Sequence, residues 1–268
     1  MRSRAFLIAF AAIACAACAA VFDVSKLGPG TENDAGPDAQ SADASADEDS
    51  AAPCPEGGAS MRRIGAYCID STETTNADYA AFLDRTDGGA SAPVNAACGD
   101  DRDRVPGETW PVAPEWQKLP VVGVSFCDAW SYCKANGKRL CGRRGIYGGA
   151  SLASSETSNA EQSEWYRACS KAATRRFPYG DEAAAGECAT QNTLRLVGEK
   201  CEGGYAGIFD MVGNAKEWID ACDSQFNGVE LCTLQGGDPI QDLADCKTVQ
   251  VLGRHAKGPL TGIRCCAD

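Results

Sequence analysis

Sixteen cysteines constrain the fold of this chain of 268 residues more than any other feature of its sequence. Disulfides persist in oxidising compartments, and exported domains use them to hold loop-rich folds together. Apart from Cys15 and Cys18 near the amino terminus, fourteen cysteines remain between Cys54 and Cys266. This even number predicts a framework of seven disulfides, but spacing alone does not reveal the pairing. Zinc is the alternative, although no CxxC motif is repeated and His255 is the only histidine.

Residues 1–18, MRSRAFLIAFAAIACAAC, have the order of an export signal. Two arginines precede an apolar run that is too short to span a bilayer, and small residues follow. Residues 12–14, Ala-Ile-Ala, precede Cys15 in a pattern similar to the lipobox of bacterial lipoproteins, whose cysteine is lipidated. Cys18 is the poorer candidate, and cleavage without lipidation is the other alternative. We expect an acyl anchor at Cys15 to hold the protein at the bacterial outer membrane or cell surface.

Residues 19–60 are predicted to form an acidic tether. Residues 28–53 are rich in Asp, Ala, Gly, Pro and Ser and have no aromatic or large aliphatic side chain. Such a segment cannot bury enough apolar surface to offset the roughly 1–2 kcal/mol per residue that backbone ordering costs. The whole chain carries a formal charge of −12, which disfavours nucleic acid as a partner.

Residues 61–268 mix apolar, polar and turn residues evenly and are predicted to form one domain. Two helices are expected where a Ser or Thr precedes an Asp by three positions in a capping box. These capping pairs are Thr75 with Asp78 and Ser125 with Asp128. The apolar faces that follow are Tyr79, Phe82 and Leu83 in the first helix and Ala129, Trp130 and Cys133 in the second.

A third helix is predicted within residues 158–170, where Ser158 and Glu161 have the same capping spacing. Its inward side chains would be those of Trp165, Ala168 and Cys169. Residues 119–124, LPVVGV, are predicted to form a buried strand. The last third of the domain is rich in glycine, which favours loops between short elements.

Seven segments in order resemble the formylglycine-generating enzyme family, also called the sulfatase-modifying factor domain, over nearly all of residues 61–268. The segments are YCIDSTETTNADYAAFL, LPVVGVSFCDAWSYCKANGKRL, SEWYRACS, RFPYGDE, YAGIFDMVGNAKEW, QGGD and TGIRCCAD. The resemblance implies a variant of the C-type-lectin-like fold, an α+β, loop-rich domain that disulfides staple here. An additional loop containing Cys141 separates GKRL from the EW helix in this chain.

The same resemblance implies a calcium ion bound by the side chains of Asp210 and Glu217 and the backbone carbonyls of Gly213 and Ala215. A turn between two carboxylates can supply the several oxygen ligands that calcium requires. Alternatively, Asp210 caps a turn and Glu217 is solvated. The family's second calcium site would use Asn192, but its partner loop is missing, and no second ion is predicted.

The family's enzymes oxidise a cysteine of an unfolded sulfatase segment to formylglycine, using oxygen, copper(I) and two thiolates after a Gly-Gly motif. Aligned from Gly236, the first catalytic cysteine corresponds to Gln241 and the second to Cys246. The Ser-Trp that usually follows the glycines is replaced by Asp238-Pro239. Because an amide is a poor copper(I) ligand, formylglycine chemistry is not expected, and copper is expected only if the domain is catalytic.

Cys246 alone has two interpretations. As a reactive thiol it would need exposure and a lowered pKa; Lys247 and Arg254 would favour the thiolate, and Asp242 and Asp245 would oppose it. As half of a disulfide it has many partners available in an oxidising compartment. The disulfide interpretation is favoured.

Other chemistries have little support in the sequence. His255 lies beside no recognisable nucleophile motif, and the glycine-rich stretches lack the strand and helix of a phosphate loop. Trp110 and Trp116 could line a groove, although core or loop packing is the commoner role. We therefore expect a non-catalytic binding or structural module of the cell envelope, with a peptide, a glycan or another envelope protein as ligand. The alternative is a copper-dependent oxidoreductase that converts a sulfatase cysteine to formylglycine or performs another thiol oxidation.

Overall fold

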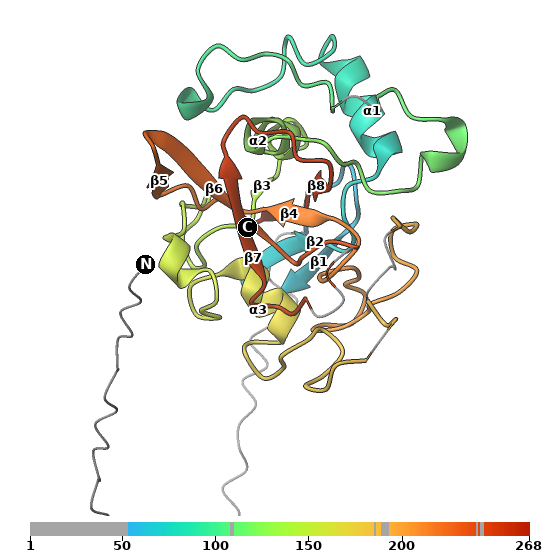
Figure 1. The fold of residues 1–268 in the computed structure, drawn as a ribbon, viewed down its shortest axis with the longest axis vertical. Helices are drawn as coiled ribbons and strands as arrows, with labels where there is room; N and C mark the ends of the chain where they lie inside the picture. The colour runs from blue at the N-terminus through green and yellow to red at the C-terminus, as the bar shows by residue number, and fades with distance from the viewer. Residues whose placement is uncertain (1–52, 108–109, 185, 189–192, 240, 242–243) are drawn as a thin grey trace, which may run out of the picture. The chain divides into compact units, whose positions relative to one another are not determined.

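A computed structural model describes the protein, and the short elements of the domain are joined by long loops (Figure 1). Within the described residues there are three α-helices and nine strands, the longest of which has seven residues. This arrangement confirms the predicted α+β, loop-rich fold class. The described residues are 53–107, 110–184, 186–188, 193–239, 241 and 244–268.

Several sequence predictions concern residues outside this described part. They are the signal at residues 1–18 and most of the tether, together with Cys15, Cys18, Asn192 and Asp242. At the end of the predicted tether, Cys54 is bonded to Cys68, and the Ser71 N–H donates to the Ser60 carbonyl at 2.7 Å. In the described part of the chain, no helix has both the length and the apolar character needed to cross a membrane.

Helices α1 (Asn76–Arg85) and α2 (Phe126–Ala135) start where the capping boxes predicted. In α1 the Asp78 N–H donates to Thr75 Oγ1 at 3.1 Å, and the Thr75 N–H donates to the Asp78 carboxylate at 3.3 Å. Ser125 and Asp128 repeat this arrangement at 3.2 and 2.9 Å. The predicted inward side chains are buried except that of Trp130, which is half-buried.

Helix α3 (Glu164–Ser170) starts later than predicted, so the capping pair Ser158 and Glu161 was wrong. Ser163 is the actual cap, and its Oγ accepts the Tyr166 N–H at 3.1 Å. The Glu161 N–H instead donates to the Asn159 side chain at 2.9 Å, a local turn that competes with helix formation. The predicted inward residues Trp165, Ala168 and Cys169 are buried, as expected.

Residues 119–124 do not form the predicted strand, although all of them except Leu119 and Val122 are buried. Their backbone bonds go to separate partners, since the Val121 N–H donates to the Thr74 carbonyl and the Val124 N–H to the Thr261 carbonyl. Gly123, between these two residues, has φ of 77°, a conformation that a strand residue does not adopt. In the part of the chain that the structure describes, three short 3₁₀-helices also occur among the loops, η2 (Ala96–Cys98), η3 (Pro114–Trp116) and η4 (Ser154–Glu156).

Two small sheets form the centre of the domain. The first, in the antiparallel order β1-β2-β9-β3, comprises β1 (Met61–Ile64), β2 (Tyr67–Asp70), β9 (Cys265–Ala267) and β3 (Arg139–Leu140). The second, in the order β5-β6-β4-β8, comprises β5 (Ser224–Phe226), β6 (Val229–Gln235), β4 (Lys216–Trp218) and β8 (Thr261–Gly262), with β7 (Val249–Gly253) paired to β6. Because β8 and β9 are separated only by Ile263 and Arg264, the end of the chain connects the two sheets.

Seven disulfides connect the fourteen cysteines from Cys54 to Cys266, which confirms the predicted framework. The pairs not yet mentioned are Cys98–Cys127, Cys133–Cys265, Cys141–Cys266, Cys169–Cys246, Cys188–Cys201 and Cys222–Cys232. The adjacent cysteines of β9 have different partners: Cys265 binds Cys133 of α2, and Cys266 binds Cys141 just after β3. The additional loop predicted around Cys141 is therefore covalently attached to the carboxy-terminal strand.

A buried ion pair also holds the first sheet. Lys138 Nζ donates to Asp70 Oδ1 at 2.6 Å and to the Ala59 carbonyl at 2.7 Å, and the Cys265 N–H donates to Asp70 Oδ2 at 2.9 Å. Burial raises the pKa of Asp70 to about 6, although Lys138 opposes the rise. Asp70 therefore depends on Lys138 to remain ionised inside the protein.

We predict that Lys138→Met destabilises the fold by about 3 kcal/mol or more at pH 7.5, because it leaves the Asp70 carboxylate buried without its partner. Since the folded-state pKa of Asp70 is raised, folding favours the protonated acid, and part of the loss should be recovered as the pH falls to 5. Urea unfolding of the oxidised protein at both pH values measures this difference. Asp70→Asn/Lys138→Met is the matched control and should lack this pH dependence. An equal loss for Lys138→Met at both pH values would contradict the prediction.

Candidate functional site

The Gly-Gly motif forms a tight turn at the end of β6. Gly236 and Gly237 have φ of 95° and 70°. A Cβ at Gly237 would lie 2.4 Å from the Ala244 Cβ, and one at Gly236 would lie 2.8 Å from the Met211 carbonyl oxygen. Only glycine fits this backbone. The Gly213 N–H donates to the Gly236 carbonyl at 2.8 Å, which places the predicted calcium turn next to the segment with Gln241 and Cys246.

Gln241 and Cys246 lie in different surroundings. Gln241 is exposed, and its N–H donates to the Asp238 carbonyl at 3.1 Å. Cys246 is fully buried, and its Sγ lies 2.09 Å from the Sγ of Cys169 in α3. Both sulfurs belong to the hydrophobic core that also contains Trp165. The partner of Cys246 is therefore a helical cysteine 77 positions earlier in the chain.

The residues at this place do not fit a copper(I) site. Two soft thiolates would be needed, whereas Gln241 offers an amide and the Cys246 sulfur is bonded to carbon and to Cys169. Asp238, which follows the glycine pair, forms an ion pair of 2.7 Å with Lys216 of β4, and both side chains are largely buried. A charged pair thus lies where the family's pattern has uncharged Ser-Trp.

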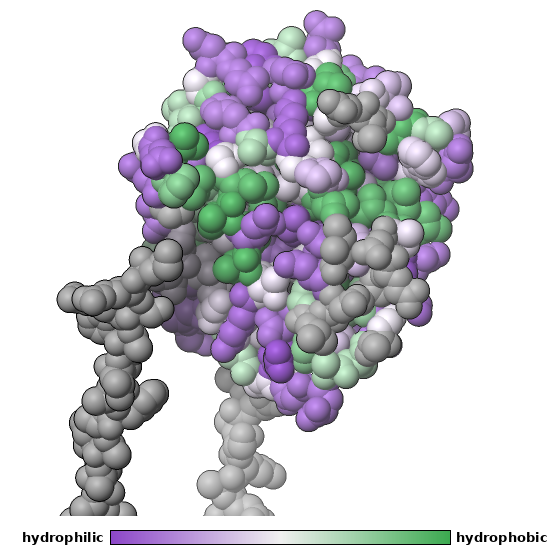
Figure 2. Space-filling view, viewed as in Figure 1, coloured by the Kyte–Doolittle hydropathy of each residue, from purple (hydrophilic) through white to green (hydrophobic). Residues whose placement is uncertain are grey.

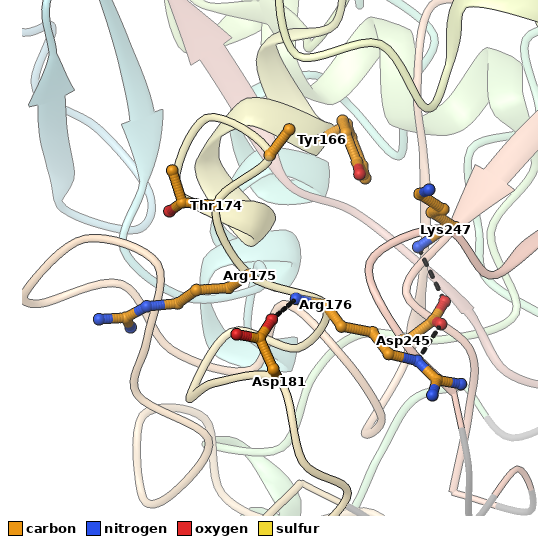
Figure 3. Close-up of a pocket in the computed structure, with 8 residues that line it drawn as sticks. Tyr166, Thr174, Arg175, Arg176, Asp181, Asp245 and Lys247 are labelled. Atoms are coloured by element: carbon orange, nitrogen blue, oxygen red, sulfur yellow. Dashed lines mark hydrogen bonds and ion pairs between the residues drawn. The ribbon is translucent and has the colours of Figure 1, made fainter. Parts of the chain in front are cut away.

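A cavity of about 350 Å³, here named the α3 cavity, is lined by Asp245 and Lys247, the two neighbours of Cys246 in the sequence (Figure 3). Its wall is formed by the end of α3 and the following turn on one side and by the residues next to Cys246 on the other. The Cys246 N–H donates to the Arg176 carbonyl at 3.2 Å and joins these two walls. The lining residues with polar side chains are Tyr166, Thr174, Arg175, Arg176, Asp181, Asp245 and Lys247.

The turn after α3 has an unusual backbone. Lys171, Ala172 and Ala173 have φ of 49°, 57° and 64°, so three consecutive residues other than glycine adopt the left-handed conformation. Each costs roughly 1–2 kcal/mol. Ser170 stabilises the turn, because its Oγ donates to the Tyr166 carbonyl at 2.6 Å and accepts the Ala173 N–H at 2.9 Å. The turn directs the chain from α3 into the wall of the cavity.

Glu217, a predicted calcium ligand, is fully buried and binds an arginine. Arg264 Nε donates to both Glu217 oxygens at 2.9 Å, and Arg264 Nη2 lies 2.7 Å from Oε1. The Trp165 indole N–H donates to Oε2 at 2.5 Å. Every Glu217 oxygen therefore already has N–H donors. The alternative interpretation of Glu217 as a solvated side chain is wrong.

Asp210, the other predicted carboxylate ligand, lies near a third buried acid, Glu73. Asp210 Oδ2 accepts the Gly198 N–H at 2.6 Å, and Glu73 Oε1 accepts the Ala215 N–H at 3.3 Å. Burial raises the pKa of Glu73, and the charges of Asp210 and Glu217 raise it further. Burial likewise raises the pKa of Asp210 to about 6.

The net charge of this cluster suits the predicted calcium ion, but only some of its groups can act as ligands. Glu73, Asp210 and Glu217 would carry three negative charges, and Arg264 supplies one positive charge, so a divalent cation would balance the remainder. Asp210 and the backbone carbonyls could bind such an ion, whereas Arg264 already binds Glu217. Among the described residues, no three His, Cys, Asp or Glu side chains converge as ligands for a metal.

The remaining sequence candidates lie elsewhere. His255 is half-exposed on the surface, and its Nδ1 lies 3.2 Å from Asp101 Oδ2. Trp110 and Trp116 line a second cavity of about 450 Å³, mostly apolar, together with Leu119, Pro120, Val122, Leu194 and Pro259. Figure 2 shows apolar patches interspersed with polar residues on the viewed face, including one over the β6 and β7 region, where Val249 and Val251 are exposed.

Sequence reasoning missed Arg264, Glu73 and Tyr166. The sequence does contain a signal for Arg264, because this charged residue lies between Ile263 and two cysteines and interrupts an apolar run near the carboxy terminus. Such a residue is rarely buried unless it is paired. The sequence contains no such signal for Glu73 and Tyr166, since their importance depends on segments distant in the sequence.

Comparison with known proteins gives a family and a fold. The profile of the sulfatase-modifying factor enzyme 1-like domain matches residues 35–268. The structure is similar to that of CarF, with a TM-score of 0.53 and 17% identity over 75% of this chain and 85% of that one. It is also similar to PvdO from Pseudomonas aeruginosa, with a TM-score of 0.51 and 18% identity over 75% of this chain and 79% of that one. A comparison with curated protein sequences finds no match.

We predict that Cys169→Ala/Cys246→Ala lowers the free energy of unfolding by about 2–4 kcal/mol, because a long loop loses its covalent closure and two core sulfurs are removed. Cys222→Ala/Cys232→Ala is the control, and it should cost less because its sequence separation is 10 rather than 77. Urea unfolding without reductant measures both. A double variant at Cys169 and Cys246 as stable as the wild type would contradict the prediction.

Proposed function

The chain belongs to the sulfatase-modifying factor enzyme 1-like domain family, and we propose that it is a non-catalytic binding module of the bacterial cell envelope. One observation carries the proposal: Cys246 is buried in a disulfide with Cys169, while Gln241 is in the place of the other thiol. A catalytic thiolate must be free and accessible. A sulfur in a core disulfide stabilises the fold instead.

The binding role is supported by the cavity that remains beside Cys246. The α3 cavity has charged side chains and a wall fixed by a disulfide, and such a site can bind a ligand without chemistry. The same loop-rich fold supports proteins of different function, so the site rather than the fold must decide the role. A peptide, a glycan or another envelope protein could be the ligand.

The location is proposed from the amino terminus and the disulfides. Seven disulfides need an oxidising compartment, which agrees with an export signal at residues 1–18. Lipidation at Cys15 would hold the domain at the outer membrane or cell surface, and the acidic tether would separate it from the lipid. We further propose calcium as a structural ion held by Asp210 and the carbonyls of Gly213 and Ala215.

We predict that the reduced, copper-loaded protein forms no aldehyde on a Cys-x-Pro-x-Arg peptide, because Gln241 cannot supply a second thiolate. Mass spectrometry of the peptide detects the product. Gln241→Cys/Cys169→Ala is the informative variant, since it provides a cysteine at position 241 and releases Cys246, and it should bind copper(I) more tightly than the wild type. An aldehyde product from the wild-type protein would establish the copper-dependent oxidoreductase instead.

We predict that calcium raises the melting temperature of the metal-free protein, because a divalent cation offsets the excess of buried carboxylate charge. Asp210→Asn should abolish this calcium-dependent increase. Glu202→Gln, at an exposed carboxylate outside the cluster, should leave it unchanged. Differential scanning calorimetry with calcium or chelator measures the effect. A melting temperature that does not respond to calcium would remove the ion from the proposal.

A further inference from the structure

Strand β7 forms an edge of the second sheet, and in the described part of the chain it pairs only with β6 (Figure 1). The Thr248 carbonyl, just before β7, accepts the Gly236 N–H at 3.2 Å, just after β6. Because the backbone bonds of antiparallel strands alternate, this contact directs the even-numbered residues of β7 toward β6. The backbone N–H and C=O groups of Val249 and Val251 therefore point away from β6, along the open edge of the sheet.

This edge lacks the features that usually prevent an edge strand from pairing with another chain. Charged side chains, proline and bulges commonly protect such edges. Val249, Gln250 and Val251 are uncharged, and β7 keeps an unbroken register with β6 over five residue pairs. The side chains of Val249 and Val251 are 48% and 42% exposed. Two β-branched residues with outward backbone groups are thus available to another strand.

The exposed valines lie on an apolar face of the sheet. Odd-numbered side chains of β6 and β7 share this face, because residues opposite each other in the ladder point the same way. On the other face, Cys232, Leu234 and Leu252 pack in the hydrophobic core. The odd-numbered face also exposes Val229 at 53%, and Figure 2 shows an apolar patch over this region. A strand added beside β7 would extend the apolar face.

A second copy of the chain fits this edge because the edge is complementary to itself. The segment Val249-Gln250-Val251 is symmetric about Gln250. If two β7 strands pair antiparallel about a two-fold axis at Gln250, Val249 lies opposite Val251 of the other copy. Each valine then exchanges both backbone hydrogen bonds with the other copy, and the four valine side chains gather on one face. One symmetric register satisfies all the outward backbone groups of these valines.

We propose that two copies of this chain associate through β7 and form one continuous sheet across a two-fold axis at Gln250. The inference goes beyond the proposed binding function, because it concerns contacts between copies and involves neither Cys246 nor the α3 cavity. Pairing of one short strand buries much less area than the roughly 1,600 Å² of a standard interface. The association is therefore weak and reversible, and it is most effective where copies are concentrated on one surface.

Sedimentation velocity of the full oxidised chain at about 5 to 500 µM tests this proposal and should show a dimer fraction that rises with concentration. Val249→Lys/Val251→Lys places lysine opposite lysine in the proposed register and should weaken the dimer about tenfold or more. Val249→Lys/Val251→Glu places lysine opposite glutamate instead. It should dimerise more tightly than the double-lysine variant and lose this advantage in about 1 M salt.

Tyr147→Lys is the control, since this side chain is 92% exposed and lies outside both sheets, and it should leave the dissociation constant unchanged. Urea unfolding of each variant verifies that the domain is folded. A wild-type chain that stays monomeric over the whole concentration range would overturn the proposal. So would a dimer that the double-lysine variant leaves intact, or equal dissociation constants for the two double variants at low salt. The peptide oxidation assay is independent of these outcomes, so failure of self-association is distinguishable from failure of the non-catalytic proposal.

Discussion

The buried ion pair between Arg264 and Glu217 connects several distant parts of this fold. Arg264 lies between β8 and β9, and besides Glu217 of β4 its guanidinium donates to the Asp70 carbonyl at the end of β2, at 2.8 Å. It also donates to the Phe209 carbonyl at 2.8 Å. Because Trp165 of α3 donates to the same Glu217, both sheets, α3 and a long loop meet at one pair of charges. Removing these charges from water costs several kcal/mol per ion, which only such complete hydrogen bonding can offset.

Two disulfides strengthen the part of the fold around this ion pair. Cys265 and Cys266 follow Arg264 directly, and their bonds to Cys133 and Cys141 span sequence separations of 132 and 125. A chain with few residues in regular structure has few backbone ladders to fix its loops, and covalent closure restricts the unfolded state instead. The carboxy-terminal strand is consequently fixed by hydrogen bonds, two disulfides and an ion pair. The amino-terminal part of the domain, from Cys54 on, is attached to that strand through β2.

What the sequence could predict depended on whether the signal was local. The capping boxes at Thr75 and Ser125 set two helix starts correctly, because cap and partner are three residues apart. The cap at Ser158 failed since Asn159 forms a competing local bond, which spacing alone does not reveal. The number of disulfides followed from composition and compartment, but pairing Cys246 with Cys169 required the folded chain. Seven segments in the family's order identified the family and its fold, because segments that are weak signals alone are strong evidence together.

The candidate site was predictable only in part for the same reason. The Gly-Gly motif located Gln241 and Cys246, whereas the α3 cavity is assembled from α3, the turn after it and the residues around Cys246. Tyr166 and Lys247 have no sequence relationship that would bring them together. The Asp210 and Glu217 pair flanks the 213–215 turn in the sequence, but Arg264 and Glu73, which contribute to the charge around it, come from opposite ends of the domain.

The bond to Cys169 makes Cys246 a structural sulfur. A copper thiolate needs an unbonded sulfur that a substrate can reach, whereas a structural sulfur must be bonded and can be buried. Cys246 cannot meet both requirements. Its bond to α3 fixes the residue between Asp245 and Lys247, while Tyr166 lies one turn before Cys169 on the same helix. The disulfide that contains the Cys246 sulfur therefore also joins the two walls of the α3 cavity, so a mutation that frees Cys246 would loosen this cavity.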